Sequence, residues 1–211
     1  MLTAIIDYES GNLHSAEKAF QRMALEVDGG TVTVTSDADV VARADRIVLP
    51  GDGAFPACAK ALRAAGTFDA MVEAVTIKGR PFLGICVGMQ LMAKRGLEYE
   101  RTDGLGWING VVDRITPNDP SLKVPHMGWN DLVIDTAHPV LADISTGDHA
   151  YFVHSYQMQM GVPNHRIAHV NYGGDVTAIV ARDTMVGFQF HPEKSAATGL
   201  RMIANFLNWR P

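Results

Sequence analysis

A cysteine framed by two glycines is the side chain in this sequence best placed to do covalent chemistry. Cys86 follows an apolar run over residues 82–85 and has Gly84 and Gly88 two positions away on either side. A Gly-x-Cys-x-Gly pattern between a strand and a helix is typical of a nucleophile elbow, which exposes the nucleophile at the carboxyl edge of a sheet. The start of the next helix would favour a thiolate, and the backbone N–H of Val87 could donate to an oxyanion. We therefore predict that Cys86 is a nucleophile.

The simpler alternative is that Cys86 is a small buried side chain at a strand-to-helix junction, as many cysteines are. The glycine frame favours catalysis over that alternative. Cys58, the other of the two cysteines, stands between alanines on an expected helix and lacks such a frame, so we expect inert packing there. Two cysteines are too few for a disulfide framework, which indicates a reducing compartment.

A histidine and a glutamate near the end of the chain could serve this nucleophile. His191 and Glu193 flank Pro192, where an expected strand at residues 185–190 gives way to a turn. In extended backbone, side chains two residues apart point to the same side, so the carboxylate could hold the imidazole in one tautomer. A neutral imidazole could take the thiol proton and return it to a leaving amine. Alone, this motif is more often a surface histidine beside a solvated glutamate; together with the elbow it predicts a catalytic triad.

A glycine-bracketed loop follows the expected strand at residues 46–49. Gly51 and Gly53 come directly after Pro50, and such a loop can present backbone N–H groups at the same sheet edge as Cys86. An ordinary tight turn is the alternative. The other seven of the eight histidines show no metal-ligand spacing, so we expect no metal site.

The candidate catalytic residues can meet only if the strands that precede them end at the same edge of one sheet. The hydrophobic pattern of the sequence predicts such a sheet. Strands alternate with helices through the first half of the chain, which favours an α/β fold with a parallel sheet covered on both faces. The expected strands are residues 3–6, 31–34, 46–49 and 81–85. The expected helices are residues 13–23, 37–44, 55–65, 68–78, 88–95 and 195–209. Beyond Gly104, short β-rich segments separated by turn residues are expected to extend the sheet as mixed or antiparallel strands.

Composition narrows the class of protein. A chain of 211 residues, 47% of them hydrophobic, suits a single domain over residues 1–211. The formal net charge of -5 and the lack of a Lys/Arg block make nucleic acid an unexpected partner. No apolar run approaches the ~20 residues of a membrane helix, and the first residues carry no basic leader segment. We therefore expect a cytoplasmic protein without membrane contact.

Six segments together resemble the class I, or triad, glutamine amidotransferases. They are DYESGN at residues 7–12, PGDGAF at 50–55, GICVGMQ at 84–90, PHMGWN at 125–130, YFVHSY at 151–156 and QFHPEKS at 189–195. The resemblance spans nearly the whole chain, and no triad position departs from it, although Val87 replaces the commoner leucine. The short Pro-Gly-x-Gly loop and the Met-Gly-Trp-Asn segment favour the histidine-pathway members of the family over its anthranilate and carbamoyl phosphate members.

The resemblance implies a flavodoxin-like α/β fold and hydrolysis of L-glutamine through a Cys86 thioester, without a cofactor. His191 would carry the proton, Glu193 would orient His191, and Gly53 and Val87 would donate to the oxyanion. The implied glutamine-binding residues are Gly51, Gly53, Gln90, Ser155 and Tyr156. The alternatives are an exposed polar residue at Gln90 and a strand-end aromatic residue at Tyr156.

The resemblance also implies a partner, a (β/α)8-barrel cyclase or synthase subunit that forms a heterodimer with this chain and takes up the ammonia. Asn12, Trp129, Tyr151 and Lys194 match positions near the mouth of the barrel; ordinary surface residues are the alternative. We expect the partner to activate the glutaminase by reorienting residues 50–53. A glutaminase of another synthase, a free-standing γ-glutamyl cysteine hydrolase and a non-catalytic module remain as alternatives.

Overall fold

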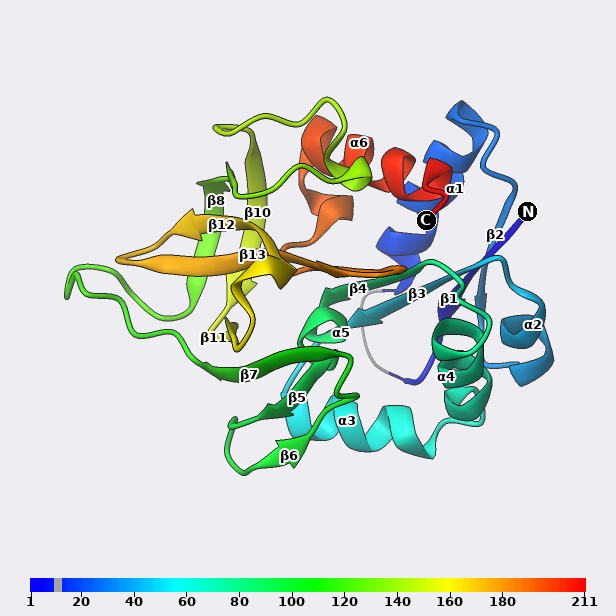
Figure 1. Ribbon diagram of the computed structural model, residues 1–211, viewed down its shortest axis with the longest axis horizontal. Helices are drawn as coiled ribbons and strands as arrows, with labels where there is room; N and C mark the ends of the chain where they lie inside the picture. Colours follow the sequence, from blue (N-terminus) through cyan, green and yellow to red (C-terminus); the bar gives the residue numbers. More distant parts are fainter. Residues whose placement is uncertain (10–12) are drawn as a thin grey trace.

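An eight-stranded mixed sheet forms the centre of the protein (Figure 1). The computed structural model describes residues 1–9 and 13–211. Across the sheet the strands are β2 (Thr31–Thr35), β1 (Leu2–Ile6), β3 (Arg46–Gly51), β4 (Phe82–Cys86), β14 (Met185–Phe188), β13 (Asp175–Arg182), β12 (Arg166–Asn171) and β9 (Val133–Ile134). Neighbours are parallel from β2 to β14 and antiparallel from β14 to β9. The predicted α/β class, with a mostly parallel sheet and added antiparallel strands, is confirmed.

Helices cover both faces of this sheet, as its buried parallel strands require. They are α1 (Leu13–Glu26), α2 (Ala38–Arg43), α3 (Phe55–Ala64), α4 (Phe68–Thr76) and α6 (Ala196–Asn208). α1 and α6 lie on one face, where the rings of Phe20 and Phe206 meet with centroids 6.4 Å apart, and α3 and α4 lie on the other (Figure 1). Within the described residues, no helix is both long enough and apolar enough to cross a membrane.

Two smaller sheets lie beside the central one. The first contains β11 (Tyr156–Met160), β7 (Ile108–Arg114), β5 (Ala93–Gly96) and β6 (Thr102–Asp103), and the second pairs β10 (His149–His154) with β8 (His126–Asp131). The sequence predicted that the later strands extend the central sheet. Of these strands, β9, β12, β13 and β14 do so, whereas the others form the separate sheets, because β8 and β10 pair with each other and β7 pairs with β11 and β5.

One predicted helix is wrong. The apolar spacing predicted a helix over residues 88–95, but α5 (Val87–Gln90) is a single turn and β5 begins at Ala93. The backbone that follows α5 bonds to β7 instead, since the N–H of Ile108 donates to the carbonyl of Met92 at 2.8 Å. Short apolar runs of this kind suit a buried strand as well as a helix, and the tertiary pairing decides between them.

The carboxyl ends of three parallel strands converge at one edge of the central sheet. Gly51 at the end of β3 lies opposite Cys86 at the end of β4, and Phe188 at the end of β14 lies opposite Ile85. The chain reaches His191 three residues after β14 ends. Ligand sites in α/β sheets form at this edge, so the fold brings together the residues that the sequence selected.

Candidate active site

Cys86 occupies a strained turn between β4 and α5. Its backbone angles are φ 55° and ψ −114°, and the single turn α5 begins at the next residue. Positive φ is uncommon for a residue with a side chain and persists where the surrounding structure enforces it. The side chain is buried, with 5% of the residue exposed, yet it lines a cavity. This geometry is that of the predicted nucleophile elbow.

Three glycines allow the backbone to pass closely around this turn. A Cβ added to Gly84 would lie 2.6 Å from the carbonyl oxygen of Gly88, and one added to Gly51 would lie 2.6 Å from the nitrogen of Gly88. A Cβ added to Gly88 would overlap the carbonyl oxygen of Leu49. All these atoms are backbone atoms that cannot move aside cheaply. The three glycines are therefore needed for packing of the elbow against β3.

Gly88→Ala tests this packing. We expect a loss of about 3 kcal/mol or more in the free energy of unfolding, because the methyl group forces β3 and α5 apart. For a chain of this size that corresponds to a fall in melting temperature of about 6 °C or more, measured by thermal unfolding. Gly66→Ala is the matched control, since a Cβ at Gly66 meets no atom within 4 Å. Equal melting temperatures for the two variants would contradict the close-packing argument.

His191 and Glu193 form the second part of the site. The Nδ1 atom of His191 lies 2.9 Å from Oε1 of Glu193, and both side chains are nearly buried. The predicted pairing is present, but the predicted extended backbone holds only at His191 (φ −95°, ψ 101°), because a turn of 3-10 helix over Pro192–Lys194 begins at the next residue. The short helical turn, not an extended strand, brings the two side chains together.

The surroundings of His191 favour its protonated form. Burial lowers the pKa of His191, but hydrogen bonds and charge interactions with Cys86 and Glu193 outweigh burial and raise the pKa to about 10. Because Nδ1 faces Glu193, the other ring nitrogen, Nε2, is the one available to Cys86. A protonated imidazole beside the nucleophile can donate to a leaving nitrogen.

Backbone contacts fix the segment that carries His191. Its N–H donates to the carbonyl of Tyr151 at 3.2 Å. The hydroxyl of Ser195 donates to the carbonyl of His191 at 2.7 Å and accepts from the N–H of Tyr151 at 2.9 Å. Ser195 is fully buried. β10 therefore holds the turn that carries His191 in place through Tyr151.

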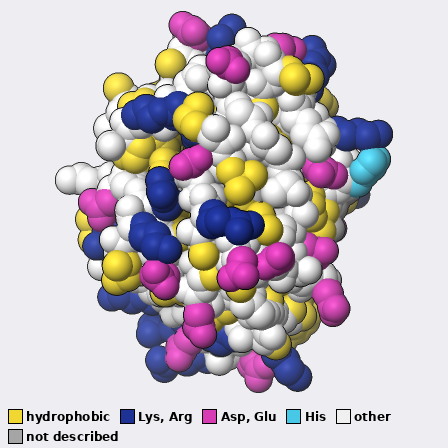
Figure 2. Space-filling model, turned by 90° about the vertical axis from the view of Figure 1, so that its right-hand side faces the viewer, with side chains coloured by type: hydrophobic (Ala, Val, Ile, Leu, Met, Phe, Trp, Pro, Cys, Tyr) yellow, Lys and Arg dark blue, Asp and Glu magenta, His cyan; other side chains and the backbone are white. Residues whose placement is uncertain are grey.

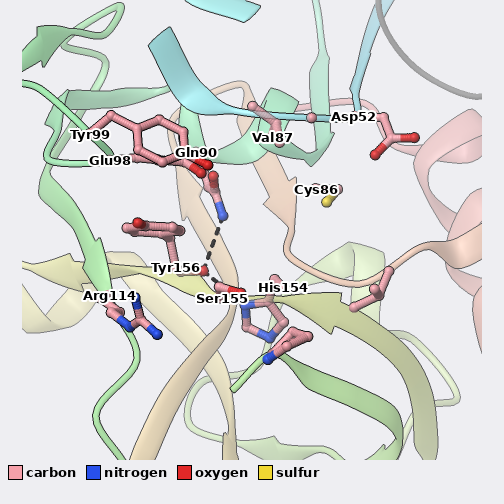
Figure 3. Close-up of a pocket in the computed structure, with 13 residues that line it drawn as sticks. Asp52, Cys86, Val87, Gln90, Glu98, Tyr99, Arg114, His154, Ser155 and Tyr156 are labelled. Carbon is pink, nitrogen blue, oxygen red and sulfur yellow. Dashed lines mark hydrogen bonds between the residues drawn. The ribbon is translucent and has the colours of Figure 1, made fainter. Parts of the chain in front are cut away.

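A cavity of about 430 Å³ opens in front of Cys86 (Figure 3). Its lining includes Gly53, Val87, Gln90, Ser155 and Tyr156, all of which the sequence selected. Figure 3 shows the side-chain amide of Gln90 directed at the main-chain carbonyl of Tyr156. The remaining lining residues are Asp52, Glu98, Tyr99, Arg114, Pro125, Val153 and His154. Most of the predicted substrate residues thus share one cavity with the nucleophile.

Gln90 is buried, so the alternative interpretation of Gln90 as an exposed polar helix residue is wrong. It is 3% exposed, and its Nε2 donates to the carbonyl of Tyr156 and to Oε1 of Gln189, each at 3.1 Å. Gly51 lies within β3 beside Cys86 and is not part of the cavity lining. Gly53 lies in the lining with φ +105°, a backbone conformation that glycine adopts without strain.

Three polar residues of the site were missed from the sequence. Glu98 and Arg114 add a carboxylate and a guanidinium to the cavity wall, and Nε2 of Gln189 lies 4.0 Å from Sγ of Cys86. Glu98 also accepts from the N–H of Phe55 at 2.8 Å, which satisfies the start of α3. Glu98 and Arg114 belong to a part of the chain without a recognisable motif. Gln189 lies one residue before the end of a predicted strand. Its position two residues before His191 was the only feature of the sequence that pointed to it.

Two buried histidines support the floor of the cavity. Nδ1 of His154 donates to the carbonyl of Tyr156 at 2.9 Å, and Nε2 of His154 accepts from Nδ1 of His126 at 3.0 Å. Nε2 of His126 in turn lies 3.1 Å from Nδ2 of Asn130. Burial lowers the pKa of His126 to about 4 and that of His154 to about 3. Both rings are therefore neutral, and the chain of bonds fixes their tautomers and the position of Tyr156.

The predicted partner residues form a patch next to the triad. Trp129 on β8 is 55% exposed, and its ring centroid lies 5.9 Å from that of Tyr151 on β10. Lys194 is exposed in the turn that carries Glu193. Met127, also on β8, is exposed as well. Asn12, the fourth predicted partner residue, lies outside the described residues.

Comparison with known proteins identifies the family. A family model for glutamine amidotransferase class-I matches residues 4–209. The chain is 73% identical to the imidazole glycerol phosphate synthase subunit HisH of Ruegeria pomeroyi and 67% identical to that of Cereibacter sphaeroides, with 100% of each chain covered in both cases. A solved glutamine amidotransferase matches 98% of this chain with 99% of its own, at 19% identity and a TM-score of 0.72, which shows a shared fold. The chain belongs to the class I glutamine amidotransferase family.

Proposed function

We propose that this protein is the glutaminase subunit of an imidazole glycerol phosphate synthase. The observation that carries the proposal is the hydrogen-bonded His191–Glu193 pair beside Cys86, whose side chain lines a polar cavity. The full-length identity to proteins named as HisH subunits of that synthase supports this branch of the family.

The reaction follows from these positions. The Cys86 thiolate attacks the side-chain amide carbon of glutamine, and His191 gives its proton to the departing nitrogen, which leaves as ammonia. The γ-glutamyl group is then a thioester on Cys86. Neutral His191 next takes a proton from water, whose oxygen attacks the thioester carbon and releases glutamate and the thiolate. Glu193 keeps the imidazole oriented through both steps.

Backbone groups stabilise the oxyanion that forms in each step. Val87, at the start of α5, and Gly53 line the cavity beside Cys86, and their backbone N–H groups are the donors that we propose. One such donor contributes about 3 kcal/mol to the transition state. The loop at residues 50–53 is the part of this arrangement that a partner can adjust, because a glycine with positive φ tolerates reorientation of the adjoining peptide.

The charged groups of the cavity suit the amino-acid end of glutamine. Glu98 can pair with the α-ammonium group, and Arg114 with the α-carboxylate. Gln90, Ser155 and Tyr156 complete the polar wall. A substrate held in this way points its side-chain amide at Cys86, which orients the reacting carbon before attack.

The ammonia needs a second subunit to use it. The relatives named HisH are subunits of a synthase, and we propose a (β/α)8-barrel cyclase subunit as the partner in a heterodimer. This subunit would combine the ammonia with its ribulosyl phosphate substrate to give imidazole glycerol phosphate and an aminoimidazole carboxamide ribotide. The patch of Trp129, Tyr151 and Lys194 supports the docking site, because Tyr151 and Lys194 adjoin His191 through backbone bonds. Contact at this patch would therefore act directly on the catalytic turn.

Glutamate release tests the proposed function. We expect the purified protein to hydrolyse glutamine slowly alone and about a hundredfold or more faster with the barrel subunit and its ribulosyl ligand, the effect of completing an oxyanion hole. Trp129→Ala should weaken this stimulation, whereas Leu25→Ala, which removes another exposed apolar side chain, should leave it unchanged. Equal rates with and without the barrel would instead indicate a free-standing hydrolase. Inactivity throughout would indicate another synthase partner or a non-catalytic protein.

A further inference from the structure

A second cavity lies at the opposite, amino-terminal edge of the central sheet. It has a volume of about 300 Å³. Its lining carries four basic side chains, Arg46, Lys78, Arg80 and Arg210, and one acidic side chain, Asp45. Figure 2 shows this side of the molecule, with Lys and Arg side chains gathered around the middle of the face. The side chains of the cavity therefore leave a clear excess of positive charge.

Arg46 is the most unusual of these residues. It begins β3, only 1% of it is exposed, and it is among the largest fully buried side chains. Its Nε and Nη1 atoms have no hydrogen-bond partner among the described residues. Its Nη2 atom meets only the sulfur of Met1, at 3.5 Å, which is a weak acceptor. A guanidinium buried without a counter-ion is strongly unfavourable.

Arg80 adds a third unsatisfied donor to the same cavity. Its Nε atom is buried and also has no hydrogen-bond partner in the described part of the chain. Its Nη1 atom lies 3.5 Å from the carboxylate of Asp45, a long ion pair with both side chains partly exposed. The other oxygen of Asp45 accepts from the N–H of Leu2 at 2.8 Å. Asp45 therefore does not neutralise both arginines.

The remaining two cations are better satisfied. Lys78 lies 3.0 Å from the carboxylate of Glu73. Arg210 donates to the carbonyls of Leu207 and Trp209, and its Nη2 atom contacts the sulfur of Met1 at 2.9 Å. Both side chains line the cavity, so their positive charges would attract an anion while buried Arg46 and partly exposed Arg80 bind it.

We propose that this cavity binds a phosphate group. A phosphate presents several acceptor oxygens in a tetrahedron, and so it can accept from the donors of two guanidinium groups that do not share a plane. A carboxylate has two oxygens in one plane and suits a single arginine better. The volume exceeds that of one phosphate, which leaves room for a small organic group beside Trp209.

This site is separate from the catalytic one. β3 carries Arg46 at its first residue and Gly51, which faces Cys86, at its last. Six residues of strand separate the two ends by roughly 16 Å. Phosphate binding therefore acts on the stability of the sheet and does not compete with glutamine.

Titration with inorganic phosphate tests the proposal. At constant pH and ionic strength, we expect phosphate to raise the melting temperature saturably and chloride to leave it unchanged. Isothermal titration should show a dissociation constant that rises about tenfold or more in Arg80→Met and Arg46→Met, the effect of losing charge-assisted hydrogen bonds. Arg22→Met, an exposed arginine on α1, is the matched control and should bind as the wild type does.

A second ligand, glycerol 3-phosphate, distinguishes a site for a phosphate monoester from a site for the free phosphate ion. Glycerol 3-phosphate that binds at least about tenfold more tightly than inorganic phosphate would assign the site to a phosphate monoester; equal affinity would assign it to the free ion. Either result supports the proposal. If Arg46→Met fails to fold, Arg80→Met alone decides, because Arg80 is partly exposed. A rise in melting temperature that does not saturate with phosphate, or a phosphate affinity that is unchanged in Arg80→Met, would overturn the proposal of a phosphate site. This outcome does not depend on whether the protein has glutaminase activity.

Discussion

Cys86→Ala is expected to lower glutamate release in the presence of the partner subunit by about ten-thousandfold or more. Removal of the nucleophile of a catalytic triad leaves only the contributions of binding and of the oxyanion donors. The variant should still bind glutamine, because the cavity walls that hold Glu98, Arg114 and Tyr156 are untouched. Steady-state glutamate release measures the first effect, and titration with glutamine measures the second.

Cys58→Ala provides the matched control. Cys58 is equally buried, on α3, and its thiol donates to the carbonyl of Asp52 at 3.3 Å. We expect this variant to keep activity within about threefold of the wild type, because the loss of a weak S–H donor costs little. An alkylating glutamine analogue should label Cys86 and not Cys58. Equal losses in the two variants would mean that the sulfur of Cys86 is not the nucleophile.

The strained turn at Cys86 could be predicted from the sequence because its signal is local. The positions of Gly84, Gly88 and Gly51 are dictated by backbone atoms within 3 Å, so no other residue type fits the turn. The parallel core strands were predicted for a related reason. Strands buried on both faces are apolar throughout, and the helices between them have their own period.

The remainder of the site depends on pairings that a local pattern does not record. Glu98 and Arg114 reach the cavity from β-rich segments whose partners are distant along the chain: β5 pairs with β7, and β7 pairs with β11. The same pairings explain why residues 93–96 form a strand where a helix was predicted. The chemistry of a carboxylate or a guanidinium alone does not indicate which cavity it faces.

The contact between His191 and Glu193 was predicted correctly, but the local conformation behind it was not. Residue types and spacing predicted that His191 and Glu193 would meet, and they do. The reason given was an extended backbone, whereas the structure has a 3-10 turn at Pro192. In the structure, the hydrogen bonds of Ser195 to Tyr151 and His191 hold this turn against β10. A correct contact can therefore follow from an incorrect local conformation.

Glu193→Gln has the second largest expected effect on activity. We expect glutamate release to fall by about a hundredfold or more, because a neutral amide no longer holds the His191 imidazolium in place. Steady-state release with the partner subunit measures the loss. Glu26→Gln, at an exposed carboxylate on α1, is the matched control and should leave the rate unchanged.

The loss of unfolding free energy in Glu193→Gln is expected to depend on pH in a definite direction. The pKa of His191 is raised in the folded protein to about 10 from 6.5, in part by the charge of Glu193. Protonation of His191 therefore stabilises the folded state fully below pH 6.5, and this contribution is lost as the pH rises towards about 10. The difference in unfolding free energy between wild type and Glu193→Gln should be largest below pH 6.5 and should shrink as the pH rises towards 10, as measured by urea unfolding. A difference that stays constant or grows with pH would show that Glu193 does not support a charged His191, and the proton donor of the proposed mechanism would have to be sought elsewhere.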